Sequence, residues 1–212
     1  MSSERERHWS AVYEQKAVDA VSWYQAAPGV DLAMIRAAAL PAGARVIDVG
    51  GGASMLVDAL LDDGLEPTVL DIAAPALAAT RARLGDRASR ARFVVADATA
   101  WTPDAAYALW HDRAVFHFLV DEPAREAYGR ALAAALAPAG HVVVGTFAPD
   151  GPERCSGLPV RRWGPDELAA ELSRASGRDL EKVQTATERH RTPWGSEQSF
   201  AFVHLRDRPP AR

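Results

Sequence analysis

The sequence predicts an α/β fold in which helices cover both faces of a mostly parallel β-sheet. Three observations carry this prediction. Short apolar segments alternate with helix-like segments between residues 44 and 147, which is typical of parallel sheets. The first apolar segment ends in three glycines, at positions 50–52, directly before a helix-like segment. Residues 180–189 and 199–206 have the pattern of two strands and predict an antiparallel hairpin at the C-terminal end.

Two helices are expected before the sheet. The first covers residues 5–16 and places Trp9, Val12 and Tyr13 on one face. The second covers residues 31–39 and has an aspartate near its start, where a helix favours negative charge.

Five strands then follow, with helices between them. We expect these strands at residues 44–49, 68–71, 92–98, 107–113 and 141–147. One helix follows the glycines, at residues 55–61. A longer helix opens at Asp121 and runs to Leu136, since Pro123 suits a first helical turn.

The region after the fifth strand contains a long loop, a helix and the hairpin. Residues 148–164 are expected to form an irregular segment, and long loops in compact domains are often functional. A helix begins at Gly164 and Pro165. The tail, residues 208–212, is expected to be frayed. No repeat or low-complexity linker divides the chain, so residues 1–212 are predicted to form a single domain.

Acidic residues stand at the ends of the first four predicted strands. They are Asp48, Asp71, Asp97 and Asp112. The carboxyl ends of parallel strands meet at one edge of a sheet, where α/β proteins bind their ligands. An acid after the second strand can accept hydrogen bonds from both hydroxyls of a ribose. Any one of these acids could instead be a helix N-cap, but the set predicts a nucleoside-binding site.

The glycines indicate which nucleoside. Glycines allow a tight turn and leave no Cβ between the backbone and a ligand. A dinucleotide-binding turn needs a further glycine where this chain has Met55, so a nicotinamide cofactor is disfavoured. Asp48, directly before the turn, suits a ligand with positive charge better than a pyrophosphate.

Residues 44–54 resemble motif I of the class I S-adenosylmethionine (SAM) dependent methyltransferases, with Ser54 where that family usually has glycine. The resemblance covers roughly residues 40–150. It implies a Rossmann-like, seven-stranded, mostly parallel sheet, SAM as methyl donor and S-adenosylhomocysteine as product. It also implies a helical N-terminal cap (1–40), a SAM-binding core (41–150) and a substrate-side loop, helix and strands (151–212).

The resemblance and the strand-end pattern together define a set of candidate residues. The expected cofactor-binding residues are Trp9, Tyr13, Trp23, Tyr24, Asp48, Gly50, Gly51, Gly52, Asp71, Ile72, Asp97, Ala98, His111 and Asp112. The expected catalytic residues are Asp112, Arg113 and His117. No metal ligands are predicted, because a single cysteine, Cys155, excludes a cysteine-rich site.

Each assignment has a chemical reason. Asp48 and Asp112 would favour the cationic parts of SAM, and the N-terminal aromatic rings would cover its sulfonium by cation–π contact. Ordinary helix packing accounts for those rings equally well. Arg113 could hold a substrate carboxylate or phosphate, or pair with a neighbouring acid. The resemblance places Asp97 beside the adenine amino group and the next backbone N–H against the ring.

The acceptor is the least determined part. The small chain favours a small-molecule S, N or O acceptor, with a protein lysine as the first alternative. No Asn-Pro-Pro-Tyr sequence, which marks methylation of exocyclic amines or Gln in this superfamily, is present. A SAM-binding module without catalysis and a NAD-dependent oxidoreductase are the remaining alternatives.

Composition bounds the partners and the location. The net charge is −4, and no run of Lys or Arg suggests nucleic acid. The charged start lacks the apolar core of a secretory signal, and no apolar run approaches membrane-spanning length. We therefore expect a cytoplasmic protein, monomeric or homodimeric, with no nucleic-acid or membrane partner.

Overall fold

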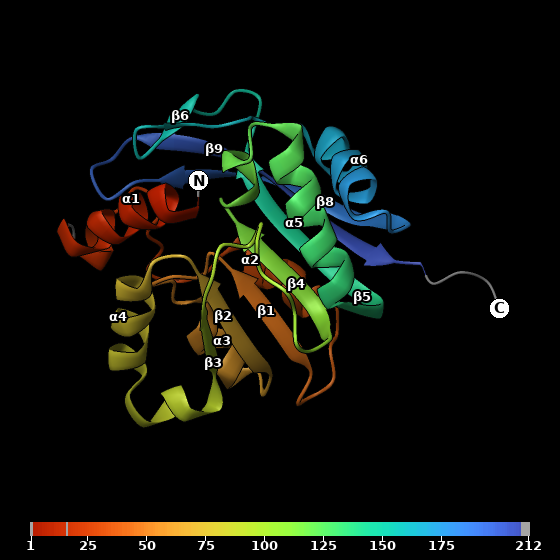
Figure 1. The fold of residues 1–212 in the computed structure, drawn as a ribbon, viewed down its shortest axis with the longest axis horizontal. Coiled ribbons are helices and arrows are strands. Elements are labelled where there is room, and N and C mark those ends of the chain that lie inside the picture. The colour runs from red at the N-terminus through yellow and green to blue at the C-terminus, as the bar shows by residue number, and fades with distance from the viewer. Residues whose placement is uncertain (1, 16, 209–212) are drawn as a thin grey trace.

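The computed structural model describes residues 2–15 and 17–208 and contains one seven-stranded sheet (Figure 1). In spatial order its strands are β3 (Arg92–Val95), β2 (Glu66–Asp71), β1 (Arg45–Val49), β4 (Tyr107–Arg113), β5 (Leu136–Phe147), β9 (Glu197–Asp207) and β8 (Leu180–Arg191). The first five pair in parallel, and β9 runs antiparallel to both of its neighbours. The predicted Rossmann-like sheet with a C-terminal antiparallel hairpin is confirmed.

Helices cover both faces of this sheet. On one face lie α2 (Val30–Ala37), α3 (Leu56–Asp62) and α4 (Ala74–Leu84), and on the other α5 (Glu122–Ala135) and α6 (Pro165–Ser176). The remaining elements are α1 (Ser2–Gln15) and three short 3₁₀ turns, Val18–Ala20, Gly85–Arg90 and Phe116–Phe118. The central strands are buried because alternate residues point to opposite apolar layers. Val46 packs with α2 and α3, whereas Ile47 packs with α5 and α6.

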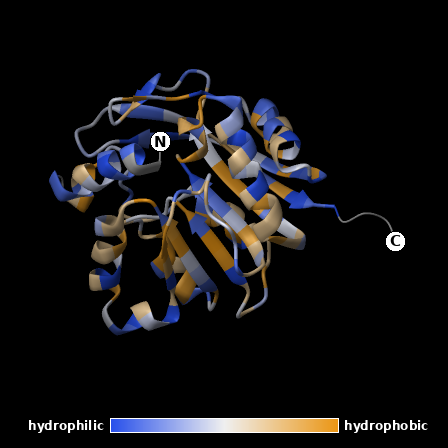
Figure 2. Ribbon diagram, viewed as in Figure 1, coloured by the Kyte–Doolittle hydropathy of each residue, from blue (hydrophilic) through white to orange (hydrophobic). Residues whose placement is uncertain are grey.

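The hydropathy of the residues agrees with this arrangement. Figure 2 shows hydrophobic residues concentrated on the central strands and hydrophilic residues along α1 and the outer surfaces of the helices. No helix in the described ranges is long and apolar enough to cross a membrane.

Several element boundaries differ from the predicted ones. The third strand ends at Val95 rather than at residue 98, which leaves Asp97 in the loop that follows. The long helix ends at Ala135, and β5 starts at once at Leu136, because Pro138 disfavours a helical conformation in the residue before it. The first helix begins three residues earlier than predicted, and residue 16, its predicted end, lies outside the described residues.

The segment predicted to be irregular contains a small hairpin. Strands β6 (Arg154–Cys155) and β7 (Leu158–Pro159) pair antiparallel. The two residues between them, Ser156 and Gly157, have φ of 48° and 79°, the backbone that a two-residue hairpin turn requires.

The predicted fraying of the tail is wrong for its first residue. The backbone N–H of Arg208 donates to the Asp179 carbonyl, and its guanidinium pairs with Glu181. The rest of that tail, residues 209–212, lies outside the described ranges.

The two helices on one face approach closely at Gly129, which gives a stability prediction. A Cβ on Gly129 would lie 2.2 Å from the backbone oxygen of Ala175 in α6. Gly129→Ala should therefore destabilise the protein by about 1–3 kcal/mol, as overpacking does. At an exposed helix position, a change from glycine to alanine stabilises the protein by about 0.5–1 kcal/mol, so the effect expected at Gly129 has the opposite sign. Urea unfolding measures the difference.

A control in the same helix isolates the steric term. Ala134 is exposed, so Ala134→Gly should cost only the intrinsic preference, about 0.5–1 kcal/mol. A Gly129→Ala variant as stable as the parent protein would show that α5 and α6 can separate without cost.

Candidate functional site

The glycine turn after β1 forms the floor of the site. Gly50 and Gly52 have φ of 70° and 42°, a backbone region that favours glycine. A Cβ on Gly52 would lie 2.8 Å from the Tyr13 hydroxyl and 2.9 Å from Asp71 Oδ2. The Thr80 hydroxyl in α4 donates to the Gly52 carbonyl over 2.7 Å and holds the turn. The turn therefore brings the backbone within contact distance of two polar groups from other elements.

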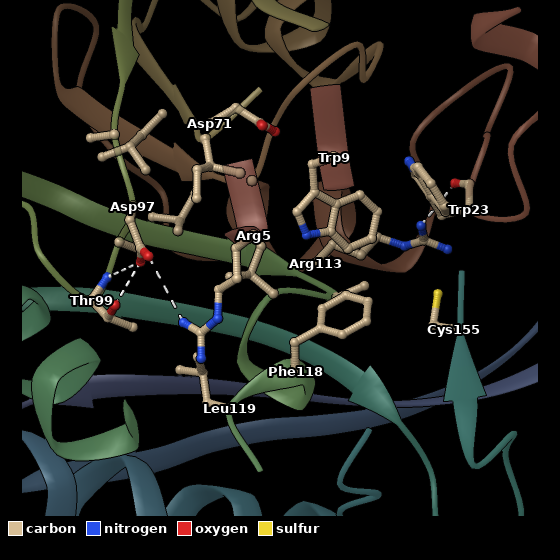
Figure 3. A pocket seen from close by; sticks show the side chains of 18 of the residues that line it. Arg5, Trp9, Trp23, Asp71, Asp97, Thr99, Arg113, Phe118, Leu119 and Cys155 are labelled. Atoms are coloured by element: carbon tan, nitrogen blue, oxygen red, sulfur yellow. Dashed lines mark hydrogen bonds and ion pairs between the residues drawn. The ribbon is translucent and has the colours of Figure 1, made fainter. Parts of the chain in front are cut away.

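A cavity lies at the carboxyl ends of β1, β2 and β4, beneath α1 (Figure 3). The cavity is partly open to solvent. Its walls include nine predicted or neighbouring residues of the strand ends: Val49, Gly50, Leu70, Asp71, Ile72, Ala96, Asp97, Ala98 and Thr99. We call this space the first cavity.

Two carboxylates face the first cavity from the ends of β2 and β3. Asp71 accepts a hydrogen bond of 2.7 Å from the backbone N–H of Ala73, and burial raises its pKa to about 7. Asp97 accepts from the backbone N–H and the hydroxyl of Thr99, at 2.9 and 2.6 Å. Its second oxygen lies 3.9 Å from Arg5 in α1. Both carboxylates are thus fixed in direction by local hydrogen bonds.

Aromatic rings form the opposite wall. The Trp9 ring centroid lies 5.6 Å from that of Trp23 and 5.1 Å from that of Phe118, both edge to face. Tyr13 packs against Trp23 at 6.1 Å. Figure 3 shows Asp97 at one end of the cavity and Trp23 at the other, with Trp9 and Phe118 between them. The N-terminal aromatic residues predicted from the sequence, except Tyr24, line this cavity.

A second cavity adjoins the first, and the two share Tyr13, Trp23, Gly50 and Arg113. Tyr24, Gly51, Asp48 and His111 line only the second cavity. Gly52 lines neither and contributes through the turn.

Buried charges gather around the second cavity. His111 Nδ1 lies 2.7 Å from Asp48 Oδ1, and its Nε2 lies 3.8 Å from Asp31 Oδ2. Burial alone lowers the pKa of His111, but the hydrogen bond and charge of Asp48 raise it overall above its ordinary value. Asp48 Oδ2 and His111 Nε2 are buried without a hydrogen-bond partner among the described residues. Such atoms are costly unless a polar ligand meets them.

Arg113 stands where the two cavities meet. Its Nη1 donates to the Trp23 carbonyl over 3.0 Å, and its Nη2 lies 3.7 Å from Glu188 Oε2. The guanidinium also lies over the Phe200 ring, 4.5 Å from its centroid. Burial lowers the pKa of Arg113, although Asp31 and Glu188 oppose that effect. Ala114, the next residue, has a φ of 73°, which bends the chain out of β4 along the cavity wall.

Asp112 lies away from both cavities, contrary to the sequence prediction. Its carboxylate accepts hydrogen bonds from the backbone N–H groups of Val115 and Phe116 and from the Tyr128 hydroxyl. It is fully buried, and burial raises its pKa to about 6. The reason is the alternation of the strand: neighbours in β4 point to opposite faces, so His111 and Asp112 cannot both reach the second cavity.

His117 is also withdrawn from the cavities. It is fully buried, and its Nδ1 lies 3.4 Å from the backbone N–H of Phe147. Burial, with a smaller effect of Arg113, lowers the pKa of His117 to about 3. Of the three predicted catalytic residues, only Arg113 lines a cavity.

The sequence prediction missed several residues of the site. Arg5, Asp31, Thr99 and Phe118 line a cavity and were not among the candidates. Only Thr99 carried a local signal, because an aspartate followed two residues later by threonine favours an Asx turn. No group of three or more His, Cys, Asp or Glu side chains in the described part of the chain is arranged to hold a metal.

Comparison with known proteins identifies the fold family. A family model described as a methyltransferase domain matches residues 46–140, which include the glycine turn and the ends of β1, β2 and β4. Residues 46–140 therefore form a methyltransferase domain, and the fold is that of the class I SAM-dependent methyltransferases. No curated protein sequence gives a significant match.

Solved methyltransferase structures share this fold. One is the Burkholderia thailandensis 1,6-didemethyltoxoflavin-N1-methyltransferase bound to 1,6-didemethyltoxoflavin and S-adenosylhomocysteine. It is 25% identical, with a TM-score of 0.63, over 85% of this chain and 80% of that one. The N-methyltransferase NodS from Bradyrhizobium japonicum WM9, in complex with S-adenosylhomocysteine, is 14% identical with a TM-score of 0.64 over 84% and 86%.

A third structure covers almost the whole chain. It comes from work on the conversion of a disulfide bond into a thioacetal group during echinomycin biosynthesis. The two chains are 19% identical with a TM-score of 0.74, and the match covers 97% of this chain and 94% of that one. The shared fold thus includes α1 and the C-terminal hairpin as well as the methyltransferase core.

Proposed function

We propose that this methyltransferase transfers the methyl group of SAM to a small molecule, with SAM spanning both cavities. The observation that carries the proposal is the convergence of Asp71, Asp97 and the first glycine of the turn, Gly50, on one cavity beneath α1. The unpartnered polar atoms of the second cavity fit this ligand.

The first cavity suits the adenosine part. Asp71 offers a carboxylate to the two ribose hydroxyls, with its direction fixed by Ala73 N–H. Asp97 offers an acceptor to the adenine amino group at the far end, while apolar groups such as Ile72 and Leu119 flank the ring plane. The backbone N–H of Ala98 is the donor expected to meet the ring.

The second cavity suits the amino-acid part, which carries one ammonium and one carboxylate. Asp48 Oδ2 is an unpartnered acceptor for the ammonium. His111 Nε2, on a ring whose raised pKa favours the protonated form, is a donor for the carboxylate. The amino-acid part of SAM needs both a negative and a positive partner, and the second cavity provides both in one buried cluster.

The protein's contribution to methyl transfer is alignment and exclusion of water. SAM supplies an already activated methyl group, so the reaction is an in-line displacement at carbon. Trp23 lines both cavities, and Trp9, which contacts Trp23 and Phe118, lines the first, so these rings can shield a sulfonium from water. The part of the first cavity beside Arg113 and Cys155 is left for the acceptor.

The remaining alternatives have less support. The matched neighbours whose acceptor is named methylate small molecules or glycopeptides, and none supports a protein-lysine acceptor. The dinucleotide alternative fails to explain the methyltransferase-domain match.

Calorimetry and labelling together test the proposal. We expect SAM to bind, NAD to show no heat of binding, and label from methyl-labelled SAM to enter the small-molecule fraction of a lysate of the source organism. Label in the protein fraction would favour the lysine alternative. Tight SAM binding with no labelled product would instead indicate a binding module without catalysis.

A further inference from the structure

Among the described residues that line the acceptor end of the first cavity, no histidine or carboxylate is placed to act as a general base. Asp112 and His117 are hydrogen-bonded and buried behind its wall. His111 pairs with Asp48 in the second cavity. Asp71 is the one lining carboxylate with a pKa near neutrality, and the proposed function commits it to the ribose. An acceptor that must lose a proton has no obvious partner to take it.

One buried cation, Arg113, is the charged group at the acceptor end. Arg113 lines this end, and its Nε and Nη2 atoms are buried without a hydrogen-bond acceptor among the described residues. Glu188 forms an ion pair with Arg113 at 3.7 Å, a distance too long for a hydrogen bond, and the charge of Asp31 also acts on Arg113. The second cation on the wall, Arg5, lies 3.9 Å from Asp97. Glu188 offsets part of the charge of Arg113, but the N–H groups of Nε and Nη2 can still donate to an anionic acceptor.

The shape and polarity of the same end favour a flat ring. Trp9 contacts both Trp23 and Phe118 edge to face, and the three rings line the cavity together with Val115 and Leu119. Aromatic walls of this kind bind planar aromatic ligands by stacking and edge contacts. An extended lysine side chain would bring an ammonium group next to Arg113, where like charges repel.

We propose that the acceptor is a small planar aromatic or heteroaromatic molecule that is already anionic at the atom receiving the methyl group, such as an aryl thiolate. The inference rests on the proposed function. The lone pair of the anion forms the new bond to the methyl carbon, and the carbon–sulfur bond breaks with its electron pair left on sulfur. The anionic and sulfonium charges both disappear, and no proton moves. Arg113 binds and positions the anion.

A pair of aryl thiols tests this directly. We would measure kcat/KM against pH with 4-nitrothiophenol and with 4-methoxythiophenol, whose thiols differ in acidity. The midpoint of each profile should follow the acidity of that thiol, because the acceptor ionises before it reacts. One midpoint common to both thiols would show that the enzyme supplies a base and would overturn the proposal. The variant Cys155→Ala tests whether the thiol that lines the cavity acts as a base. We expect the midpoints of its two pH profiles to equal those of the parent protein.

Charge selectivity gives a second readout. With SAM saturating, thiophenol should be preferred over benzylamine by roughly 10- to 100-fold in kcat/KM, the range expected for a charge-assisted hydrogen bond. Arg113→Met should remove most of that preference through a higher KM for the thiol. Preference for benzylamine, or no binding of either thiol to protein that binds SAM, would overturn the proposal. Absence of SAM binding would instead refute the proposed function, so the two failures are distinguishable.

Discussion

Asp71→Asn should weaken SAM binding by about 10- to 100-fold, the range of a lost charged hydrogen bond, while making the ligand-free protein more stable at pH 8. The two effects have one cause. Asp71 is fully buried, and burial raises its pKa from 3.8 to about 7, so the ionised form needed to hold a ribose is unfavourable in the empty site. Removing that charge stabilises the folded state, and it also removes the hydrogen-bond acceptor for the ribose hydroxyls of the ligand.

The direction of the pH dependence follows from linkage. An acid whose folded pKa is raised binds more protons when folded, so stability falls as pH rises from about 4 to about 7. The full shift corresponds to about 4 kcal/mol, an upper bound, and burial of the replacing amide lowers the expected gain to about 1–2 kcal/mol. The gain should be complete above pH 7 and vanish near pH 4.

Thermal unfolding at pH 8 and pH 4.5, with calorimetric titration of SAM, measures both effects. Asp104→Asn serves as the control, because Asp104 is exposed and pairs with Arg92 at the surface. That variant should be slightly less stable and should bind SAM normally. Equal affinity in a folded Asp71→Asn protein would remove Asp71 from the ribose site.

Asp112→Ala should lower the free energy of unfolding by about 3–5 kcal/mol. The substitution leaves three buried donors without an acceptor, namely the N–H groups of Val115 and Phe116 and the Tyr128 hydroxyl. These bonds hold the turn that leads from β4 into the cavity wall. Urea unfolding followed by circular dichroism gives the loss.

Tyr128→Phe is the matched variant. It removes the hydroxyl that accepts from Trp110 and donates to Asp112, so we expect a smaller loss of about 1–2 kcal/mol. The double variant should lose less than the sum, since the two side chains share one bond. Asp112→Asn, which keeps an acceptor oxygen, decides between structure and chemistry. If it stays folded but loses turnover with unchanged SAM affinity, Asp112 acts in catalysis after all.

The fold was predicted well because each helix or strand is indicated by residues that are close together in the sequence. Parallel buried strands leave runs of apolar residues, and the glycine turn and Pro123 mark element ends through backbone preferences that need no tertiary contact. The placement of Asp71 and Asp97 at one cavity followed from the common edge of parallel strands. One boundary error arose where tertiary pairing extends a strand, at Leu136 opposite Tyr107.

The site was predicted less well, for a geometric reason. Residues from α1 and α2, such as Arg5 and Asp31, reach the cavities only after the chain folds back over the sheet, and the periodicity of the sequence carries no signal for that. Asp112 and His117 were chosen for their chemistry at the right end of β4. The face of the sheet to which a strand side chain points depends on its place in the alternation along the strand. In addition, the backbone N–H groups of Val115 and Phe116 bind the Asp112 carboxylate, which was predicted to bind a ligand.

The position of α1 has a kinetic consequence. Trp9 and Tyr13 wall the first cavity, and Arg5 reaches across to Asp97. If SAM binds beneath them as proposed, we expect spent and fresh donor to exchange mainly while the helix is undocked. The undocking rate of α1 would then limit turnover, and solvent viscosity should slow catalysis wherever undocking is slower than the chemical step.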